Sequence, residues 1–379
     1  MSDRYLHVVT FNVPHPPDYG GVIDVYYKLK ALHAAGIRIH LHCYLYDRPR
    51  SAHLNSICET VTYYKRKMSI IDLLNQLPYI VYSRRSGKLL DNLLADENPI
   101  LFEGIHTCYF LAHEKLSSRL KMVRAHNIES EYYRHLVEQA SGLKKYYFKR
   151  ESQKLAEFEK ILKHANHIFT ISSRDTIELS AVYDNVELLP PFHSSDKVTC
   201  MEGTGAYALY HGDLSISDNY QTGLYLCESI FTDMNIPLII AGKKPNPKLI
   251  AKAKSHPNVQ VIIDPDHEKM EELIRDAHVN IMLTSNTSGF KLKLINALFK
   301  GRYCLVNSNM LEGTGLDDLC LLGNSDESIR SLLNDYFNKP FESSEIQRRK
   351  NILEDKFSNA SNAGKLIKIL SHSSVSDMG

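Results

Sequence analysis

The chain has 379 residues, of which 43% are hydrophobic and 23% charged, and this length predicts two globular domains. Its 45 Lys and Arg residues balance 44 Asp and Glu residues, which argues against a protein that binds nucleic acid through bulk positive charge. No apolar run approaches the roughly 20 residues that a membrane-spanning helix needs. Seven cysteines, an odd number without a C-x-x-C pair, predict a reduced cytoplasmic protein with neither a disulfide framework nor a zinc knuckle.

Short apolar strands alternate with helices along the chain, a pattern typical of parallel α/β sheets. We expect a first series of strands at residues 6–11, 38–44, 60–64, 100–103, 122–124, 167–171 and 186–189. A second series is expected at residues 207–211, 237–241, 259–263, 279–283 and 303–306. The Pro- and Ser-rich stretch 189–196 suits a hinge. These features predict an N-terminal domain over residues 1–195, a C-terminal domain over 196–350, and a C-terminal helix and tail over 351–379.

A glycine pair follows the first expected strand. The loop from residue 12 onward contains His15 and leads through Gly20 and Gly21 into a helix. Ligands of open α/β sheets bind beyond the carboxyl ends of the strands, and a helix N-terminus with glycines lets backbone N–H groups approach an anion. A tight turn without a ligand is the alternative interpretation of this loop.

Polar side chains also follow the fourth and fifth expected strands. Glu103 and His106 end one strand, and His126, Asn127 and Glu129 follow the next. An imidazole can donate a hydrogen bond to a hydroxyl group or relay a proton near neutral pH. We therefore expect functional side chains here, although Asn127 could instead cap the next helix.

Residues 119–164 contain eleven Lys or Arg against six Asp or Glu. Basic side chains interleaved with aromatic ones can rest on an anionic membrane surface or an anionic lipid carrier. The alternative is the solvated face of an ordinary amphipathic helix, which the spacing of Glu159 and Lys163 supports better. Peripheral contact with the inner membrane face is thus an option for a protein expected in the cytoplasm.

The stretch 284–306 combines a polar loop, a helix of about a dozen residues, a stop at Gly301 and an apolar strand. A loop that enters a helix presents free N–H groups and the positive end of the helix dipole, and this arrangement suits a phosphate. Lys291 and Lys293 add positive charge in the first turn. Gly212 ends the first strand of this domain, and Lys243 and Lys244 follow the next strand. An ordinary α/β loop with solvated lysines is the alternative.

The segment from Gly289 and Phe290 through Asn296 to Gly301 resembles the donor-site motif of GT-B glycosyltransferases, glycosyltransferase family 4 in particular. The resemblance implies an α/β, GT-B fold of two Rossmann-like domains facing across a cleft, with the C-terminal helix packing back on the first domain. It puts Ser288 where the family has the glutamate that approaches the transferred sugar. It puts Asn296 where the family has the glutamate that binds the ribose hydroxyls.

The resemblance also implies roles outside this segment. His126 would contact the transferred sugar, and Gly20 and Gly21 would close over the donor pyrophosphate. Further residues are then expected to line the acceptor pocket: His15, Glu103, His106, Asn127 and Glu129. The family's phosphate-binding Arg and Lys are replaced here by Asp213 and by Asn219 or Tyr220. We therefore expect the diphosphate to be held by Lys243 or Lys244 and by the loop-helix start at residues 288–291, with Lys293 helping.

The expected function is transfer of a sugar from a UDP- or GDP-linked donor to a hydroxyl of a carbohydrate or glycolipid acceptor. By resemblance this transfer is retaining and needs no metal, and the nucleotide sugar is a co-substrate rather than a cofactor. Two alternatives stay open. A GT-B nucleotide-sugar epimerase would need acid/base groups around the anomeric carbon and no acceptor. A non-catalytic GT-B subunit would explain why both motif glutamates and the Arg/Lys pair are replaced.

Overall fold

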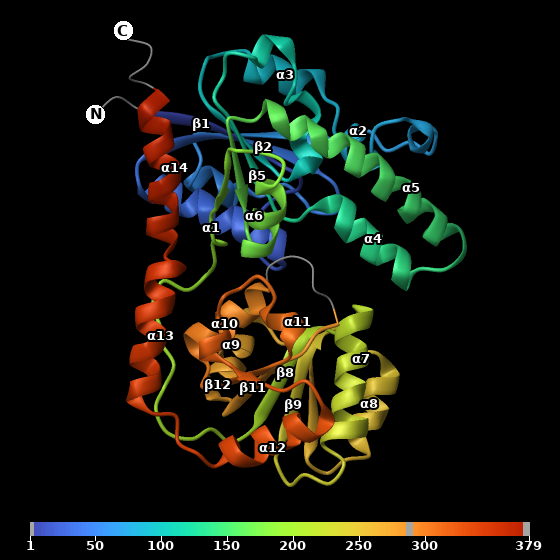
Figure 1. Ribbon diagram of the computed structural model, residues 1–379, viewed down its shortest axis with the longest axis vertical. Helices are drawn as coiled ribbons and strands as arrows, with labels where there is room; N and C mark the ends of the chain where they lie inside the picture. Colours follow the sequence, from blue (N-terminus) through green and yellow to red (C-terminus); the bar gives the residue numbers. More distant parts are fainter. Residues whose placement is uncertain (1–3, 286–290, 374–379) are drawn as a thin grey trace. The chain divides into compact units, whose positions relative to one another are not determined.

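The structure is a computed structural model that describes residues 4–285 and 291–373. The chain divides into two compact units, each with its own parallel sheet (Figure 1). Unit 1 contains the described residues up to His193 and those from Phe357 onward. Unit 2 contains the described residues from Ser194 to Lys356.

In the described part of unit 1, seven strands form one sheet in the order β3-β2-β1-β4-β5-β6-β7, and every pairing is parallel. The strands are β1 (Arg4–Thr10), β2 (Ile37–Leu45), β3 (Thr60–Lys65), β4 (Ile100–Glu103), β5 (Lys121–Ala125), β6 (His167–Thr170) and β7 (Val186–Leu188). Strands β4 and β5 are buried along their whole length, as expected for central strands covered by helices on both faces.

The α-helices of unit 1 are α1 (Gly20–Ala34), α2 (Tyr79–Tyr82), α3 (Gly87–Leu93), α4 (Glu129–Gln139), α5 (Gly142–Phe158), α6 (Ser173–Ser180) and α14 (Asn359–Ser373). Shorter helical turns are η1 (Ala52–Ser56), η2 (Ile71–Leu74), η3 (Ile105–Phe110), η4 (Glu114–Leu116) and η5 (Glu159–His164).

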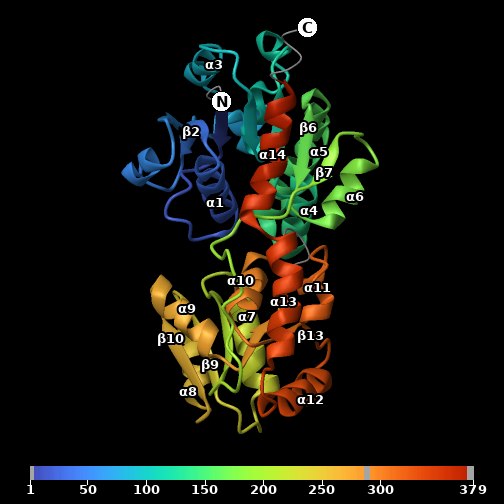
Figure 2. The same cartoon turned by 90° about the vertical axis from the view of Figure 1, so that its left-hand side faces the viewer.

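The helices of unit 1 cover both faces of its sheet. Val8 packs in one apolar cluster with Leu29 of α1 and Leu366 of α14, whereas its neighbour Val9 packs in a second cluster with Leu155 of α5. Successive residues of a strand point to opposite faces, so the two clusters are the two core layers of the unit. The C-terminal helix α14 packs beside α1 (Figures 1 and 2) and is part of unit 1, so the C-terminal helix packs back on the first domain as expected.

Unit 2 has a described sheet of six parallel strands in the order β10-β9-β8-β11-β12-β13. The strands are β8 (Ala208–Asp213), β9 (Leu238–Lys243), β10 (Val259–Ile263), β11 (Val279–Met282), β12 (Tyr303–Val306) and β13 (Leu321–Leu322). Its helical segments are α7 (Ser217–Tyr225), η6 (Leu226–Ile230), α8 (Pro247–Lys254), α9 (His267–Asp276), α10 (Leu292–Lys300), α11 (Ser308–Leu311), η7 (Asp317–Leu319), α12 (Asp326–Phe337) and α13 (Ser343–Lys356).

Each strand expected from the sequence overlaps an observed strand, and the expected pair of parallel α/β sheets is confirmed. Helix α10 is shorter than expected because Lys291 has a non-helical backbone and Gly301 is extended. Strand β13 was not expected, since two residues are too few to show a period. No helix in the described part of the chain is long and apolar enough to cross a bilayer.

Strands β8 and β9 approach each other most closely at two glycines. A Cβ atom on Gly242 would lie 1.9 Å from the carbonyl oxygen of Gly212, a distance that no side chain tolerates. Because both strands end here, this contact fixes the spacing of the two loops that follow them.

We predict that Gly242→Ala destabilises unit 2 by about 1–3 kcal/mol or more, because strand β9 must shift to admit the methyl group. The matched control is Gly364→Ala in α14, where an added Cβ meets nothing within 4 Å. Alanine should stabilise that helix by about 0.5–1 kcal/mol. The midpoints of urea unfolding measure both changes, and equal midpoints for the two variants would contradict the close approach.

Candidate functional site

Four charged side chains are buried together in unit 1, where β4 and β5 end beside α1. Arg124 of β5 donates to Asp24 of α1 through Nη2 at 2.9 Å and through Nε at 3.2 Å. Lys28 Nζ donates to Asp24 Oδ2 at 3.0 Å and to Glu103 Oε1 at 2.7 Å. All four side chains are at most 1% exposed. Positive and negative groups alternate, so each buried charge has a partner of the opposite sign. We call these four residues the charge network.

His126 is attached to the charge network through Glu103. Its Nε2 lies 2.9 Å from Glu103 Oε2, and its ring meets the ring of Phe11 edge-on at 5.5 Å. Burial alone would raise the pKa of Glu103, but Lys28 and the hydrogen bond from His126 outweigh burial and hold this pKa below its ordinary value. Glu103 is therefore ionised, and its carboxylate accepts the hydrogen bond from His126 Nε2.

Asp24, Glu103 and His126 also have the mutual spacing of metal ligands, with one ligand atom of each lying within 4.8 Å of the others. Lys28 already bonds to both carboxylates, so an ammonium group supplies the positive charge that a metal would bring. We interpret this set as an ion-pair network and not as a metal site.

Two further expected residues lie near His126. The ring of His106 packs on Phe11 at 5.4 Å, and its buried Nδ1 has no hydrogen-bond partner among the described residues. Burial, reinforced by Arg84, keeps the pKa of His106 well below its ordinary value, so the imidazole is neutral. Phe11 also contacts the position of Gly21, where an added Cβ would lie 2.8 Å from Cζ of the ring. The Phe11 ring thus brings His106, His126 and Gly21 together.

Glu129 begins α4 and is buried. Burial raises the pKa of this carboxyl group to about 7, and Glu159 adds to the rise, while a hydrogen bond from Asn127 Nδ2 at 3.2 Å opposes it. A carboxyl group that titrates near neutral pH can both accept and donate a proton. Glu129 is thus a buried carboxyl group that changes its protonation near neutral pH.

Other expected residues of unit 1 lie apart from this group. His15 stacks on His53 at 4.5 Å and hydrogen-bonds Ser51 Oγ at 2.9 Å. Gly20 is the exposed first residue of α1. The sequence did not single out Asp24 and Lys28, because an Asp and a Lys four residues apart on a helix usually form a surface pair. Here the side of α1 that carries them faces the strand ends.

A second polar cluster lies in unit 2, around the start of α10. The Lys293 ammonium lies 5.7 Å from the ring centroid of Tyr210, and burial lowers its pKa to about 8 while Asp218 partly offsets the effect. His211, at the end of β8, is 7% exposed, and burial followed by the charge of Lys293 lowers its pKa to about 3. His211 is therefore a neutral imidazole beside a cation.

Two polar atoms in this cluster lack partners. Among the described residues, neither His211 Nε2 nor Asn296 Oδ1 has a hydrogen-bond partner, although both are buried. Lys293 and Asn296 are three residues apart in α10 and share one side of the helix. A buried polar group without a partner costs about 1–3 kcal/mol, so these two atoms are candidates for hydrogen bonds to a ligand. We call Lys293, His211 and Asn296 the polar triad.

Asp218 ties the loop after β11 to α7. Its carboxylate accepts from Thr284 Oγ1 at 2.7 Å and from the backbone N of Ser285 at 2.9 Å. These hydrogen bonds outweigh burial and lower the pKa of Asp218. Asp218 therefore both anchors the loop that leads toward α10 and faces Lys293 with a negative charge.

The remaining expected donor residues are exposed, half-buried or outside the described residues. Lys243 ends β9, Lys244 follows it, and both side chains are exposed. Lys291 caps α10, and an added Cβ on Gly212 would meet the side chain of Asn219 at 3.1 Å. The residues that lie outside the described part are Ser288, Gly289 and Phe290.

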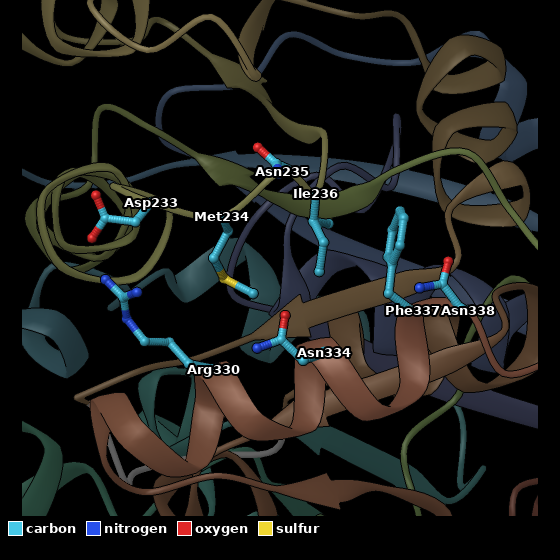
Figure 3. Close-up of a pocket in the computed structure, with 8 residues that line it drawn as sticks. All are labelled: Asp233, Met234, Asn235, Ile236, Arg330, Asn334, Phe337 and Asn338. Atoms are coloured by element: carbon cyan, nitrogen blue, oxygen red, sulfur yellow. The ribbon is translucent and has the colours of Figure 1, made fainter.

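A cavity of about 450 Å³ lies elsewhere in unit 2 (Figure 3). Residues 233–236, which precede β9, form one wall, and Arg330, Asn334 and Phe337 of α12 form another. This cavity is at the amino ends of the strands, whereas ligands of open α/β sheets bind beyond the carboxyl ends. We therefore place the candidate site at the polar triad.

No family model matches the sequence. An uncharacterized 44.6 kDa protein in the cps region of Klebsiella pneumoniae is 24% identical over 331 residues, which cover 81% of this chain and 84% of that protein.

Solved glycosyltransferase structures resemble the chain over nearly its whole length. The Anabaena protein HepE in complex with UDP and glucose matches with a TM-score of 0.66 at 9% identity, over 97% of this chain and 99% of HepE. WaaG, a glycosyltransferase involved in lipopolysaccharide biosynthesis, matches with a TM-score of 0.64 at 13% identity, over 96% of this chain and 99% of WaaG. The chain has the GT-B fold.

We predict that Lys28→Met lowers the free energy of unfolding of unit 1 by about 3–5 kcal/mol, because it leaves two buried carboxylates with too little positive charge. Lys88→Met is the matched control, since Lys88 is an exposed lysine of α3 and its loss should change stability by less than about 0.5 kcal/mol. Urea unfolding measures both variants. A cost for Lys28→Met as small as that of the control would show that the network does not hold the unit together.

Proposed function

We propose that this chain is a glycosyltransferase that moves a sugar from a UDP- or GDP-linked donor to a hydroxyl of a carbohydrate or glycolipid acceptor. The observation that carries the proposal is the polar triad in unit 2, near the start of α10. There a cation lies close to two buried polar atoms that have no hydrogen-bond partner within residues 4–285 and 291–373. The GT-B fold and the UDP bound to HepE support a nucleotide sugar as the ligand.

In this proposal the triad binds the donor. A diphosphate needs positive charge in a partly dehydrated site, and Lys293 with the N-terminal end of α10 supplies it. Lys293 thereby takes the place of the Arg/Lys pair that the family resemblance leads one to expect. Asn296 Oδ1 accepts from a ribose hydroxyl, and His211 Nε2 completes its hydrogen bonding with a second donor oxygen. Lys243 and Lys244 are exposed, so in this proposal they contribute less to diphosphate binding than Lys293 does.

The leaving diphosphate is neutralised by the ammonium group and the helix dipole, and this arrangement favours a metal-independent route. His126 is the proposed contact to the transferred sugar, because the hydrogen bond to Glu103 fixes the orientation of its ring. Glu129 is the proposed proton acceptor for the attacking hydroxyl, because its pKa of about 7 matches that task. Retention of anomeric configuration is proposed on the family resemblance.

Peripheral contact of the basic region 119–164 with a membrane would bring the chain to a lipid-linked acceptor.

The two alternative functions would use the same donor site. An epimerase would change the nucleotide sugar without an acceptor, a non-catalytic subunit would bind the donor and change nothing, and a transferase would release nucleoside diphosphate when the acceptor is added.

The test of the donor site is calorimetric titration of UDP and of GDP into the protein. We predict that one of them binds and that Lys293→Met weakens this binding about tenfold to a hundredfold, because a charge-assisted phosphate contact contributes about 1.5–3 kcal/mol. Lys248→Met removes an exposed lysine of α8 and should leave binding unchanged. The free nucleoside should bind the Lys293 variant and the unchanged protein equally. Absence of binding by both nucleotides would refute the proposal.

The low pKa of Lys293 gives the same site a pH dependence. Only the protonated ammonium attracts a diphosphate, and that form is lost as the pH rises through about 8. We therefore predict that nucleoside diphosphate binding weakens about fourfold between pH 7 and pH 8.5, since the phosphate groups are already ionised over that range. In Lys293→Met the affinity should not vary with pH. An unchanged slope in the variant would assign the pH dependence to another group.

A further inference from the structure

Two arginines meet at the carboxyl edge of the sheet of unit 1. Arg66 directly follows β3, and its Nε and Nη2 donate to Ser83 Oγ at 3.1 Å and 2.7 Å. Arg84 is the next residue after Ser83. Its Nε and Nη2 donate to the carbonyl oxygen of Phe11, just past β1, at 3.2 Å and 3.0 Å. We call Arg66 and Arg84 the arginine pair.

The arginine pair concentrates positive charge. Arg84 is 4% exposed, and burial, reinforced by the charge of Arg66, lowers its pKa to about 9. Both guanidinium groups are therefore charged at neutral pH and lie close enough to repel each other. Each also acts on His106, as described below.

The two guanidinium groups differ from their neighbours in their partners. Arg85 pairs with Asp72 at 3.0 Å, and the buried Arg124 pairs with Asp24 at 2.9 Å. Neither member of the arginine pair forms an ion pair with an acidic side chain in residues 4–285 and 291–373. Positive charge that is removed from water without a counterion is costly, so the pair is a candidate for contact with an anion.

Tyrosine side chains surround Arg66. Its guanidinium carbon lies 4.4 Å from the ring centroid of Tyr46, which follows β2 and is 56% exposed. Burial lowers the pKa of Arg66, and the hydroxyl groups of Tyr46, Tyr133 and Tyr147 partly offset this effect. Tyr133 belongs to α4 and Tyr147 to α5. A tyrosine offers both an apolar ring and a hydroxyl group, and a sugar presents the same two kinds of surface.

The arginine pair adjoins a residue of the expected acceptor pocket. After burial, the charge of Arg84 contributes most to the low pKa of His106, and Arg66 acts in the same direction. Arg84 also acts on Glu129, but this carboxyl group has a pKa of about 7 and carries only about half a charge at neutral pH. An anion held by the pair would thus lie near the side chains that the proposed function assigns to the acceptor.

We infer that the arginine pair binds the anionic substituent, a carboxylate or a phosphate, of an acidic acceptor sugar. Arg66 makes the direct contact, because it is half-buried and its Nη1 donates to no other described residue. Arg84 lies deeper and adds its charge. Guanidinium groups bind oxyanions through paired N–H donors, and the attraction is stronger where water is partly excluded. The role as acceptor rests on the proposed sugar transfer, whereas binding of the acidic sugar does not.

NMR titration with matched sugars tests the inference. The acidic probes are methyl glucuronide, methyl galacturonide and glucose 6-phosphate, and each is compared with its neutral parent sugar. At least one acidic sugar should bind about tenfold or more tightly than its parent, and the arm that does so identifies the anion as carboxylate or phosphate. No binding by any acidic probe, or equal binding of acidic and neutral sugars, would overturn the inference. So would inorganic phosphate that binds as tightly as the acidic sugars.

Substitution of Arg66 connects this binding to the arginine pair. Arg66→Met should weaken binding of the acidic sugar about tenfold or more, and Arg66→Lys, which keeps the charge but loses the paired donors, should have a smaller effect. The matched control is Arg50→Met. Arg50 is an exposed arginine of unit 1 whose guanidinium carbon lies 5.3 Å from the ring centroid of Tyr63, and its loss should change nothing. Equal effects of Arg66→Met and Arg50→Met would contradict the assignment.

Two further variants separate binding from folding. Ser83→Ala removes the hydrogen-bond partner of Arg66 but keeps both charges, so it should retain most of the acidic-sugar binding. Tyr46→Ala removes an exposed ring that folding does not need and should weaken the binding. If Ser83→Ala abolished binding and Tyr46→Ala left it unchanged, Arg66 would act only by fastening Ser83, and the inference would be wrong.

Nucleotide titration keeps this test apart from that of the donor site. Arg66→Met should bind UDP or GDP like the unchanged protein, because the polar triad belongs to unit 2. A protein that binds a nucleoside diphosphate but no acidic sugar would overturn this inference and leave the donor site standing. A protein that binds an acidic sugar through Arg66 but neither nucleotide would refute the donor site alone.

Discussion

Asp24 joins three parts of unit 1 through one buried carboxylate. It accepts from Arg124 at the end of β5, from Lys28 one turn along α1, and from the backbone N of Phe192 at 2.8 Å, beyond β7. Arg124 also donates to the carbonyl oxygens of Thr170 and Leu189, at the ends of β6 and just past β7. The strand ends and α1 are thus held together by charged groups that are buried away from water and can pair only with one another.

The orientation of His126 depends on this arrangement. Lys28 keeps Glu103 ionised, and the Glu103 carboxylate accepts a hydrogen bond from His126 Nε2, so the orientation of the His126 ring is fixed within the unit. Preorganisation of this kind lowers the cost of binding and of catalysis, because the group need not be oriented at the moment of reaction. The polar triad of unit 2 is the opposite case, since two of its buried polar atoms still lack partners among the described residues. In the proposed function, the bound nucleotide completes the hydrogen bonding of these two atoms.

Much of this could be predicted from the sequence, for identifiable reasons. The alternation of short apolar runs with helices was enough to place the strands, because central parallel strands are apolar on both faces. The family resemblance pointed to Asn296, and the lysines of the loop-helix start pointed to Lys293. The charge network could not be found, because the spacing of Asp24 and Lys28 is the same for a buried pair and a surface pair. The arginine pair was missed for a similar reason, since a sequence does not show which arginines the fold brings together away from acidic side chains.

The central claim is that Lys293 and Asn296 hold the nucleotide. A crystal structure of the chain with its nucleoside diphosphate tests it most directly. The account predicts a phosphate oxygen within hydrogen-bond distance of Lys293 Nζ, about 2.7–3.1 Å, and a ribose hydroxyl donating to Asn296 Oδ1. A nucleotide in the cavity beside Arg330 and Asn334, or one whose diphosphate contacts Lys243 and Lys244 without Lys293, would contradict it.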